Sequence, residues 1–173
     1  MTSKQTPSPN RILVIGSSNT DMVIKTEKLP APGETILGGR FLMNPGGKGA
    51  NQAVAAARLG GKVTFIGKRG NDLFGNQAMG LFMREGIDTQ YIVKDPELPS
   101  GVALITVDSA GENSIVVAPG SNGNLLQEDI PVKVFDFEYD YRHEDPFPVN
   151  GVNSELVNKN FDLVFGEITK FIS

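Results

Sequence analysis

The most informative segment of this chain is Asn44-Pro45-Gly46-Gly47-Lys48-Gly49-Ala50-Asn51-Gln52-Ala53-Val54-Ala55-Ala56-Ala57-Arg58-Leu59-Gly60-Gly61. Its clustered glycines allow a sharp turn and a close approach of the backbone to a ligand. Small apolar residues then recur at helical spacing from Ala50, which predicts a helix that ends at Gly60. Such a helix start presents unpaired N–H groups, and Lys48 adds a positive charge. The segment predicts a site for hydroxyl groups or an anion, or else a tight turn into a packing helix.

Two phosphate-binding loops do not fit this segment. A Walker A loop needs glycine at position 42 and serine or threonine at position 49, and the chain has Leu42 and Gly49. A dinucleotide fingerprint beginning at Gly47 needs a small residue at position 52, where Gln52 stands. Neither loop is therefore predicted here.

A buried strand is expected from Arg11 to Ser17, because this run is almost continuously apolar. Asn19 and Asp21 follow at its carboxyl end, where ligands of open α/β sheets collect. Asn and Asp also form turns, so their pattern alone leaves a binding role and a turn open.

Strand and helix patterns alternate further along the chain. A strand over 62–67 precedes a helix that begins after Asp72 as N-cap and ends at Gly86, and a strand over 91–93 follows. This alternation predicts an α/β fold with a doubly wound parallel sheet. Asp72 is expected to be a cap and not a catalytic acid.

Four more strands are expected in two pairs. Segments 22–28 and 35–43 flank a turn with two prolines and a glycine. Segments 102–107 and 113–118 flank a five-residue loop, which is typical of a hairpin.

The two ends of the chain carry weaker patterns. Residues 1–10 are polar and are expected to be disordered. Aromatic and acidic residues alternate over 135–141, which predicts a strand, and apolar spacing over 156–172 predicts a helix. His143 has acidic sequence neighbours, but adjacent side chains diverge, so no metal site is predicted. Residues 131–173 are left as an unassigned tail.

The composition is that of an ordinary globular protein, with 39% hydrophobic and 21% charged residues. The formal charge of −4 favours neither nucleic acid nor an anionic membrane as partner. Cysteine is absent, which excludes disulfides, and no apolar run reaches the length of a membrane span. A small molecule or a second copy of the chain is the expected partner, with cytoplasmic residence.

Four motifs stand in order along the chain. They are Ile12-Leu13-Val14-Ile15-Gly16-Ser17-Ser18-Asn19-Thr20-Asp21, Leu29-Pro30-Ala31-Pro32-Gly33-Glu34-Thr35, Gly46-Gly47-Lys48-Gly49-Ala50-Asn51-Gln52-Ala53 and Gly70-Asn71-Asp72-Leu73-Phe74-Gly75. Together they resemble the N-terminal part of the ribokinase family (PfkB family) of carbohydrate kinases. The resemblance runs from about Arg11 to about Asp129, so residues 11–130 are expected to form the corresponding region.

The resemblance implies a fold, an activity and a site. The fold is a ribokinase-like parallel sheet with a small β lid, drawn from residues 22–43 and 102–118, through which two subunits pair as a homodimer. The activity is transfer of a phosphoryl group from ATP to the 5-hydroxyl of D-ribose, with Mg²⁺ and a monovalent cation (K⁺). Fructose and nucleosides are substrates of other members. The implied sugar-binding residues are Asn19, Asp21, Gly46, Gly47, Lys48, Asn51, Ala103, Ile105 and Ile115. For the last three, plain sheet packing is an equal alternative.

The chemical part of the family pattern is missing. The sequence has no Gly-x-Gly-Asp, whose Asp is the family's catalytic base, and no Asn-x-x-Glu, which the family uses near magnesium and phosphate. The chain ends at a little over half the usual family length, so it is expected to be truncated and to lack the ATP and metal sites. Since phosphoryl transfer depends on those groups, little kinase activity is expected from this chain alone. A non-catalytic sugar-binding or dimerisation remnant is the alternative.

Overall fold

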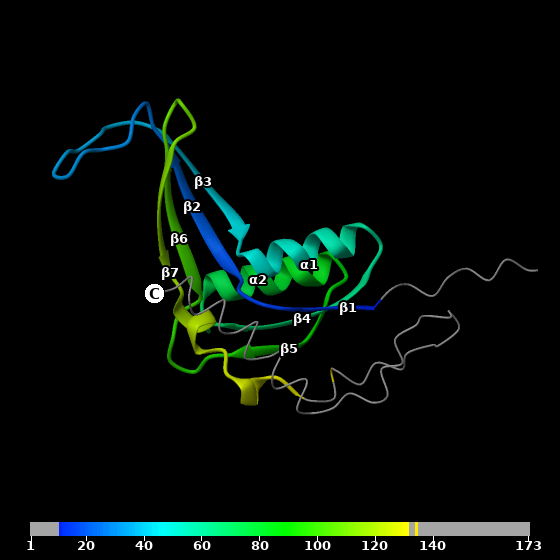
Figure 1. The fold of residues 1–173 in the computed structure, drawn as a ribbon. Coiled ribbons are helices and arrows are strands. Elements are labelled where there is room, and N and C mark those ends of the chain that lie inside the picture. Colours follow the sequence, from blue (N-terminus) through cyan, green and yellow to red (C-terminus); the bar gives the residue numbers. More distant parts are fainter. Residues whose placement is uncertain (1–10, 132–133, 135–173) are drawn as a thin grey trace, which may run out of the picture. The chain divides into compact units, whose positions relative to one another are not determined.

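The computed structural model describes residues 11–131 and 134. Figure 1 shows their two sheets and two α-helices. The elements in chain order are β1 (Arg11–Ile15), β2 (Asn19–Lys25), β3 (Arg40–Gly46), α1 (Lys48–Arg58), β4 (Lys62–Arg69), α2 (Leu73–Arg84), β5 (Asp88–Lys94), β6 (Gly101–Val107), β7 (Asn113–Ala118) and two 3₁₀ turns, Gly120–Asn124 and Gln127–Asp129. The expectations for residues 1–10, 135–141 and 156–172 lie outside the described residues.

The first sheet is parallel and has the order β1-β4-β5. Both helices lie on the same side of it (Figure 1), and one apolar core joins them to the strands. The rings of Phe65 on β4 and Phe82 on α2 contact each other in a tilted arrangement, with centroids 4.8 Å apart and planes at 35°. Asp72 caps α2 by accepting a hydrogen bond from the Gly75 N–H at 2.8 Å, as the sequence predicts. The expected alternation of strands and helices around a parallel sheet is confirmed.

The second sheet has the order β3-β2-β6-β7 and is called the lid sheet below. β2 pairs with β6 in parallel, while β2–β3 and β6–β7 are antiparallel. The β6–β7 hairpin has the predicted bounds except that β6 begins one residue earlier, at Gly101. The Asp108 carboxylate holds the hairpin loop by accepting hydrogen bonds from the N–H groups of Ala110 and Glu112. In Figure 1 the lid sheet extends away from the helices and the parallel sheet.

The first two lid strands differ from their predicted bounds. β2 begins at Asn19 and not at Met22, because its first residues already pair with β6 from Gly101 onward. β3 begins at Arg40 and not at Thr35. The two residues before it, Gly38 and Gly39, have φ of 99° and 107°, which are incompatible with extended strand geometry.

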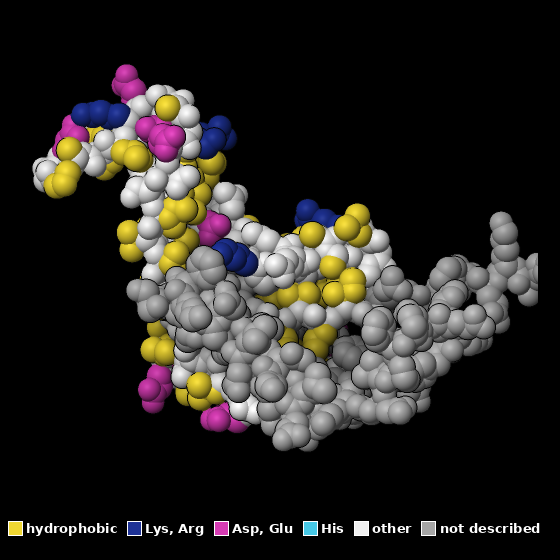
Figure 2. Space-filling view, viewed as in Figure 1, with side chains coloured by type: hydrophobic (Ala, Val, Ile, Leu, Met, Phe, Trp, Pro, Cys, Tyr) yellow, Lys and Arg dark blue, Asp and Glu magenta, His cyan; other side chains and the backbone are white. Residues whose placement is uncertain are grey.

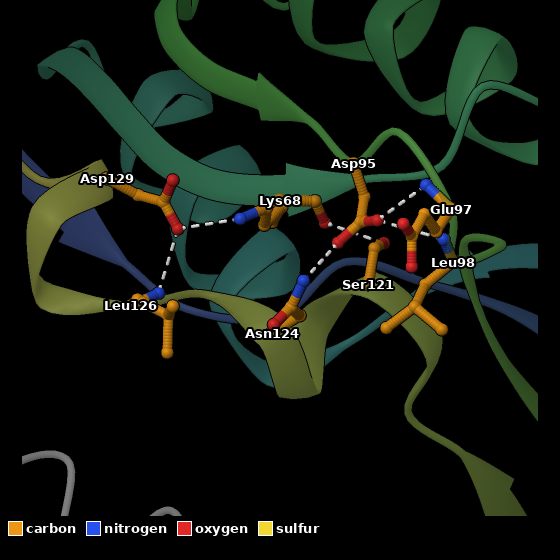
Figure 3. Close-up of polar contacts among 8 residues, drawn as sticks. All are labelled: Lys68, Asp95, Glu97, Leu98, Ser121, Asn124, Leu126 and Asp129. Carbon is orange, nitrogen blue, oxygen red and sulfur yellow. Dashed lines mark hydrogen bonds and ion pairs between the residues drawn. The ribbon is translucent and has the colours of Figure 1, made fainter.

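Residues 119–130, called the strap below, return from the lid sheet to the parallel sheet. Figure 3 shows three of its side chains holding the carboxyl ends of β4 and β5. Ser121 Oγ donates to the carbonyl of Lys68 at 3.2 Å, and Lys68 Nζ forms an ion pair with Asp129 at 2.8 Å. Asn124 Nδ2 donates to Asp95 at 2.7 Å. The strap thus ties the last strand of the lid sheet to the parallel sheet.

Asp95 is the most buried carboxylate in this network, with 1% of its surface exposed. It accepts bonds from the N–H groups of Leu98 at 2.8 Å and Glu97 at 3.0 Å, besides the bond from Asn124. The Leu98 N–H, then the Asn124 amide and the Glu97 N–H, lower the pKa of Asp95 from 3.8 to about 2. A carboxyl group whose pKa is lower in the folded than in the unfolded protein stabilises the fold at pH values above its ordinary pKa. This contribution is lost as the pH falls from about 4 to about 2.

Asp95→Asn removes the charge that this network solvates. We expect a lower urea midpoint at pH 7, and a difference from the unaltered protein that shrinks between about pH 4 and pH 2. Urea unfolding followed by circular dichroism over this pH range measures both. Glu128→Gln, exposed on the same strap, is the control and should follow the unaltered protein. A constant difference at every pH would contradict the assignment.

Candidate functional site

The start of α1 packs directly against the bend between β1 and β2. Gly47, the N-cap residue of α1, has φ 93° and ψ 131°, and a Cβ there would lie 2.7 Å from the Ser17 carbonyl oxygen. A Cβ on Gly49 would lie 2.8 Å from the Cα of Gly16. The Ala50 N–H donates to the Ser17 carbonyl at 3.0 Å. Close approach at Gly47 and Gly49 therefore serves the chain's own backbone, which is the packing alternative for these glycines.

Gly46 is the last residue of β3 and not part of a loop, and it pairs with Asn19 of β2. A Cβ at Gly46 would fall 2.1 to 2.3 Å from the carboxylate atoms of Asp21. The Asp21 side chain therefore occupies the space above this glycine. Burial raises the pKa of Asp21 from its ordinary value of 3.8, as expected for a carboxylate that lacks compensating partners.

The strand register places most of the predicted site residues on one face of the lid sheet. Neighbours in register share a face. Asn19 is level with Gly46 and Gly101, and Asp21 is level with Ala103. One step further along the same face, Val23 is level with Ile105, which is level with Ile115 on β7. Asn19, Asp21, Gly46, Ala103, Ile105 and Ile115 therefore share a face, polar near α1 and apolar away from it.

Asn19 and Asp21 do not follow the first strand as loop residues. They are the first and third residues of β2, so their side chains project from the lid sheet. The chain moves from one sheet to the other within residues 16–18. The prediction that they lie beyond the end of β1 is confirmed, but a strand and not a turn holds them.

Lys48 and Asn51 lie in the first turn of α1, and both are exposed. Their spacing of three residues puts them on neighbouring positions of the helix surface. No side chain caps this helix at Gly47, and α1 begins directly after β3. Two donor side chains and the positive end of a helix therefore lie close in sequence to Gly46, the glycine beneath Asp21.

Asn122 of the strap was not identified from the sequence. Its Oδ1 accepts from the Ser18 N–H at 2.9 Å, and its Nδ2 donates to the Ser18 carbonyl at 3.1 Å and to Asn19 Oδ1 at 2.8 Å. Ser18 and Asn122 are 104 residues apart. The cluster of Pro, Gly, Ser and Asn over 119–124 predicts only a turn. No local pattern in the sequence therefore predicts the contact of Asn122 with Ser18 and Asn19.

Within residues 11–131, no three or more His, Cys, Asp or Glu side chains gather into a group that could hold a metal ion. His143, with its acidic neighbours, lies outside the described residues. In the same part of the chain, no helix is long and apolar enough to cross a membrane.

Gly47→Ala tests whether the structure depends on the close packing of the start of α1 against the bend at residues 16–18. Gly60→Ala is the matched control, because Gly60 has a similar φ of 89° but open space around its Cβ position. Backbone strain alone should cost about 1 to 3 kcal/mol in each variant. The collision with Ser17 should make Gly47→Ala clearly less stable than Gly60→Ala in urea unfolding. Equal losses of stability in the two variants would mean that the collision with Ser17 adds nothing to the cost of backbone strain.

Comparison with known proteins agrees with this arrangement. The family model "pfkB family carbohydrate kinase" matches residues 9–164, beyond the residue 129 at which the recognised motifs stop. The ribokinase of Bacillus subtilis is 38% identical over 157 residues, which cover 80% of this chain and 53% of that protein. The chain thus spans about half the length of this relative.

Two solved structures have the same fold in this region. The ribokinase of Giardia lamblia superposes with a TM-score of 0.66 at 36% identity, covering 70% of this chain and 37% of that one. The Arabidopsis thaliana ribokinase complexed with ribose and ATP has a TM-score of 0.59 at 34% identity, covering 66% and 37% of the two chains.

Proposed function

Since the chain belongs to the pfkB family of carbohydrate kinases, we propose that it supplies the sugar-binding part of an enzyme that phosphorylates D-ribose on its 5-hydroxyl. The observation that carries this proposal is the shared face of Asn19 and Asp21 on the lid sheet, next to the start of α1. Relatives named ribokinase, one of them complexed with ribose and ATP, support ribose as the sugar and ATP as the donor.

The proposed site recognises a polyol by matched hydrogen bonds. The Asp21 carboxylate accepts from sugar hydroxyls, while Lys48 and Asn51 donate to them. Asn19 adds a further polar contact, and Gly47 brings the start of α1 next to the sugar. The apolar side chains of Ala103, Ile105 and Ile115 contact the carbon face of the ring. A few polar groups in an otherwise apolar site are typical of small-molecule binding.

The phosphoryl-transfer step needs groups that this part of the chain does not supply. Mg²⁺ would neutralise charge on the phosphates of ATP, with K⁺ as the proposed monovalent cation. The residues described do not fit a metal site, and the sequence has no Gly-x-Gly-Asp to provide a base. We therefore propose that the isolated chain binds ribose with little or no turnover. A non-catalytic sugar-binding remnant is the second candidate, favoured by the same missing motif. The proposed location is the cytoplasm, where ATP is available.

Calorimetric titration of the purified chain with ribose, beside an assay of ADP formation with Mg-ATP, tests this proposal. We expect binding without turnover. Asp21→Asn should weaken ribose binding about tenfold or more, because a hydrogen bond to a charged group contributes about 1.5 to 3 kcal/mol. Glu112→Gln, on the exposed β6–β7 loop, is the control. Turnover at ordinary kinase rates would overturn the inactivity, and no binding of ribose would overturn the sugar site.

The opposite face of the lid sheet is proposed to pair two copies of the chain. Met43, Met22, Leu104 and Val116 are in register across all four strands of that face. Three of them are well exposed, Met43 at 44%, Leu104 at 55% and Val116 at 66%. Figure 2 shows hydrophobic side chains at the surface of this sheet. An exposed apolar row of this kind is suited to burial against a second copy.

Two neighbouring valines on β7 separate the faces. Val116 lies on the face proposed to pair two copies, which is called the outer face below, and Val117 lies on the face that carries Asp21. Their exposed fractions are 66% and 53%. We expect Val116→Asp to convert a dimer into a monomer in sedimentation velocity, because a charge would be buried in the interface. Val117→Asp should remain dimeric. A monomeric unaltered chain would contradict the proposed dimer.

A further inference from the structure

Asn122 connects the strap to the proposed sugar site, and this inference rests on the function proposed above. Its side-chain amide has four hydrogen-bond partners, three of which share the two hydrogens of Nδ2. It accepts from the Ser18 N–H at 2.9 Å and donates to the Ser18 carbonyl at 3.1 Å, to the Pro119 carbonyl at 3.1 Å and to Asn19 Oδ1 at 2.8 Å. Both ends of the amide are therefore in use.

The backbone of Ser18 fixes which way this amide points. A backbone N–H can only donate and a backbone carbonyl can only accept. Asn122 must therefore turn Oδ1 toward the N–H and Nδ2 toward the carbonyl of Ser18. Its Nδ2 then lies 2.8 Å from the Asn19 side chain, where only an acceptor is tolerated. The amide of Asn19 is consequently held with Oδ1 toward Asn122, and its own Nδ2 is left to donate elsewhere.

The neighbouring glycines leave the space that this arrangement needs. A Cβ on Gly101 would lie 2.1 Å from Asn122 Nδ2 and 2.3 Å from Asn19 Oδ1. Gly101 is level with Asn19 on β6, and Gly46 is level with it on β3. The Asn19–Asn122 pair lies over Gly101, as Asp21 lies over Gly46. Gly46 and Gly101, on either side of Asn19, thus leave room on this face for the Asp21 carboxylate and for the Asn19–Asn122 pair.

We propose that Asn122 is a positioning residue that makes Asn19 present a hydrogen-bond donor to the sugar. The donor stands two residues along β2 from the carboxylate of Asp21, which only accepts. One donor and one acceptor on the same face match hydroxyl groups that accept from Asn19 and donate to Asp21. Asn122 is not proposed to touch the sugar.

The test compares ribose binding by calorimetry in three variants. Asn122→Asp keeps the acceptor for Ser18 N–H but loses the donor that orients Asn19, so ribose binding should weaken at least tenfold. Asn19→Asp keeps the acceptor for Asn122 but replaces the donor offered to the sugar, and should weaken binding similarly. Asn124→Ala is the matched control, because Asn124 is an amide of the same strap turn that binds Asp95 instead. It should bind ribose like the unaltered chain.

Side-chain amide NMR separates positioning from a merely structural role. In the unaltered chain the NH₂ of Asn122 should exchange slowly with water and that of Asn19 rapidly, and the Asn19 signal should move when ribose is added. In Asn122→Asp the Asn19 NH₂ should become protected, because it turns toward the new carboxylate. Rapid exchange at Asn122 with slow exchange at Asn19 in the unaltered chain would overturn the proposal.

The outcomes distinguish this proposal from the proposed function. Normal ribose affinity in Asn122→Asp would overturn the positioning and leave the sugar site standing. If Asn122→Asp does not fold, normal affinity in Asn19→Asp has the same meaning. If the unaltered chain does not bind ribose, the sugar site fails, and the exchange rates of the two amides still decide the orientation of Asn19.

Discussion

The backbone contact between the first turn of α1 and the bend at residues 16–18 is the constraint on which the described structure depends. At this contact the end of β1 in the parallel sheet, the start of β2 in the lid sheet and the start of α1 pack against one another. A Cβ at Gly47 or Gly49 would come within 2.7 to 2.8 Å of this backbone, and a Cβ at Gly16 would lie 3.0 Å from the Cα of Gly49. Because interiors are close-packed and transmit small displacements, any change at this contact alters the lid sheet and α1 together.

The strap supplies the second connection between the sheets. Lys68 and Asp95 are buried, so loss of the ion pair with Asp129 would leave the buried ammonium of Lys68 without that partner, and loss of Asn124 would remove one of the three hydrogen bonds to Asp95. Asn122 belongs to the same segment and contacts Ser18 and Asn19. One segment therefore joins the carboxyl ends of the parallel strands to the face of the lid sheet that carries the candidate site. The site is held from two sides, by α1 and by the strap.

Local signals allowed much of this to be predicted from sequence. The Asp72 cap, the β6–β7 hairpin and the alternation of strands and helices each depend on residues close in the chain. The start of β2 at Asn19 depends on pairing with β6, more than eighty residues away, and could not be seen locally. The clustered glycines predict a close approach at positions 47 and 49, and in the structure that approach is to the chain's own backbone, while contact with a ligand stays a prediction. Asn122 was missed because its partners are distant and a turn explains its composition equally well.

Every strand of the lid sheet contributes side chains to both of its faces, and this limits which insertions and deletions the strands tolerate. Side chains alternate between faces along β2, so inserting or deleting one residue within the strand would exchange the faces. Asp21 would then join the apolar outer row and Met22 would enter the polar face. The connection at residues 26–39 carries no such restriction, since its length does not set the register on either side of it. Variation in length among relatives is therefore expected in that connection, while β2 itself keeps its number of residues.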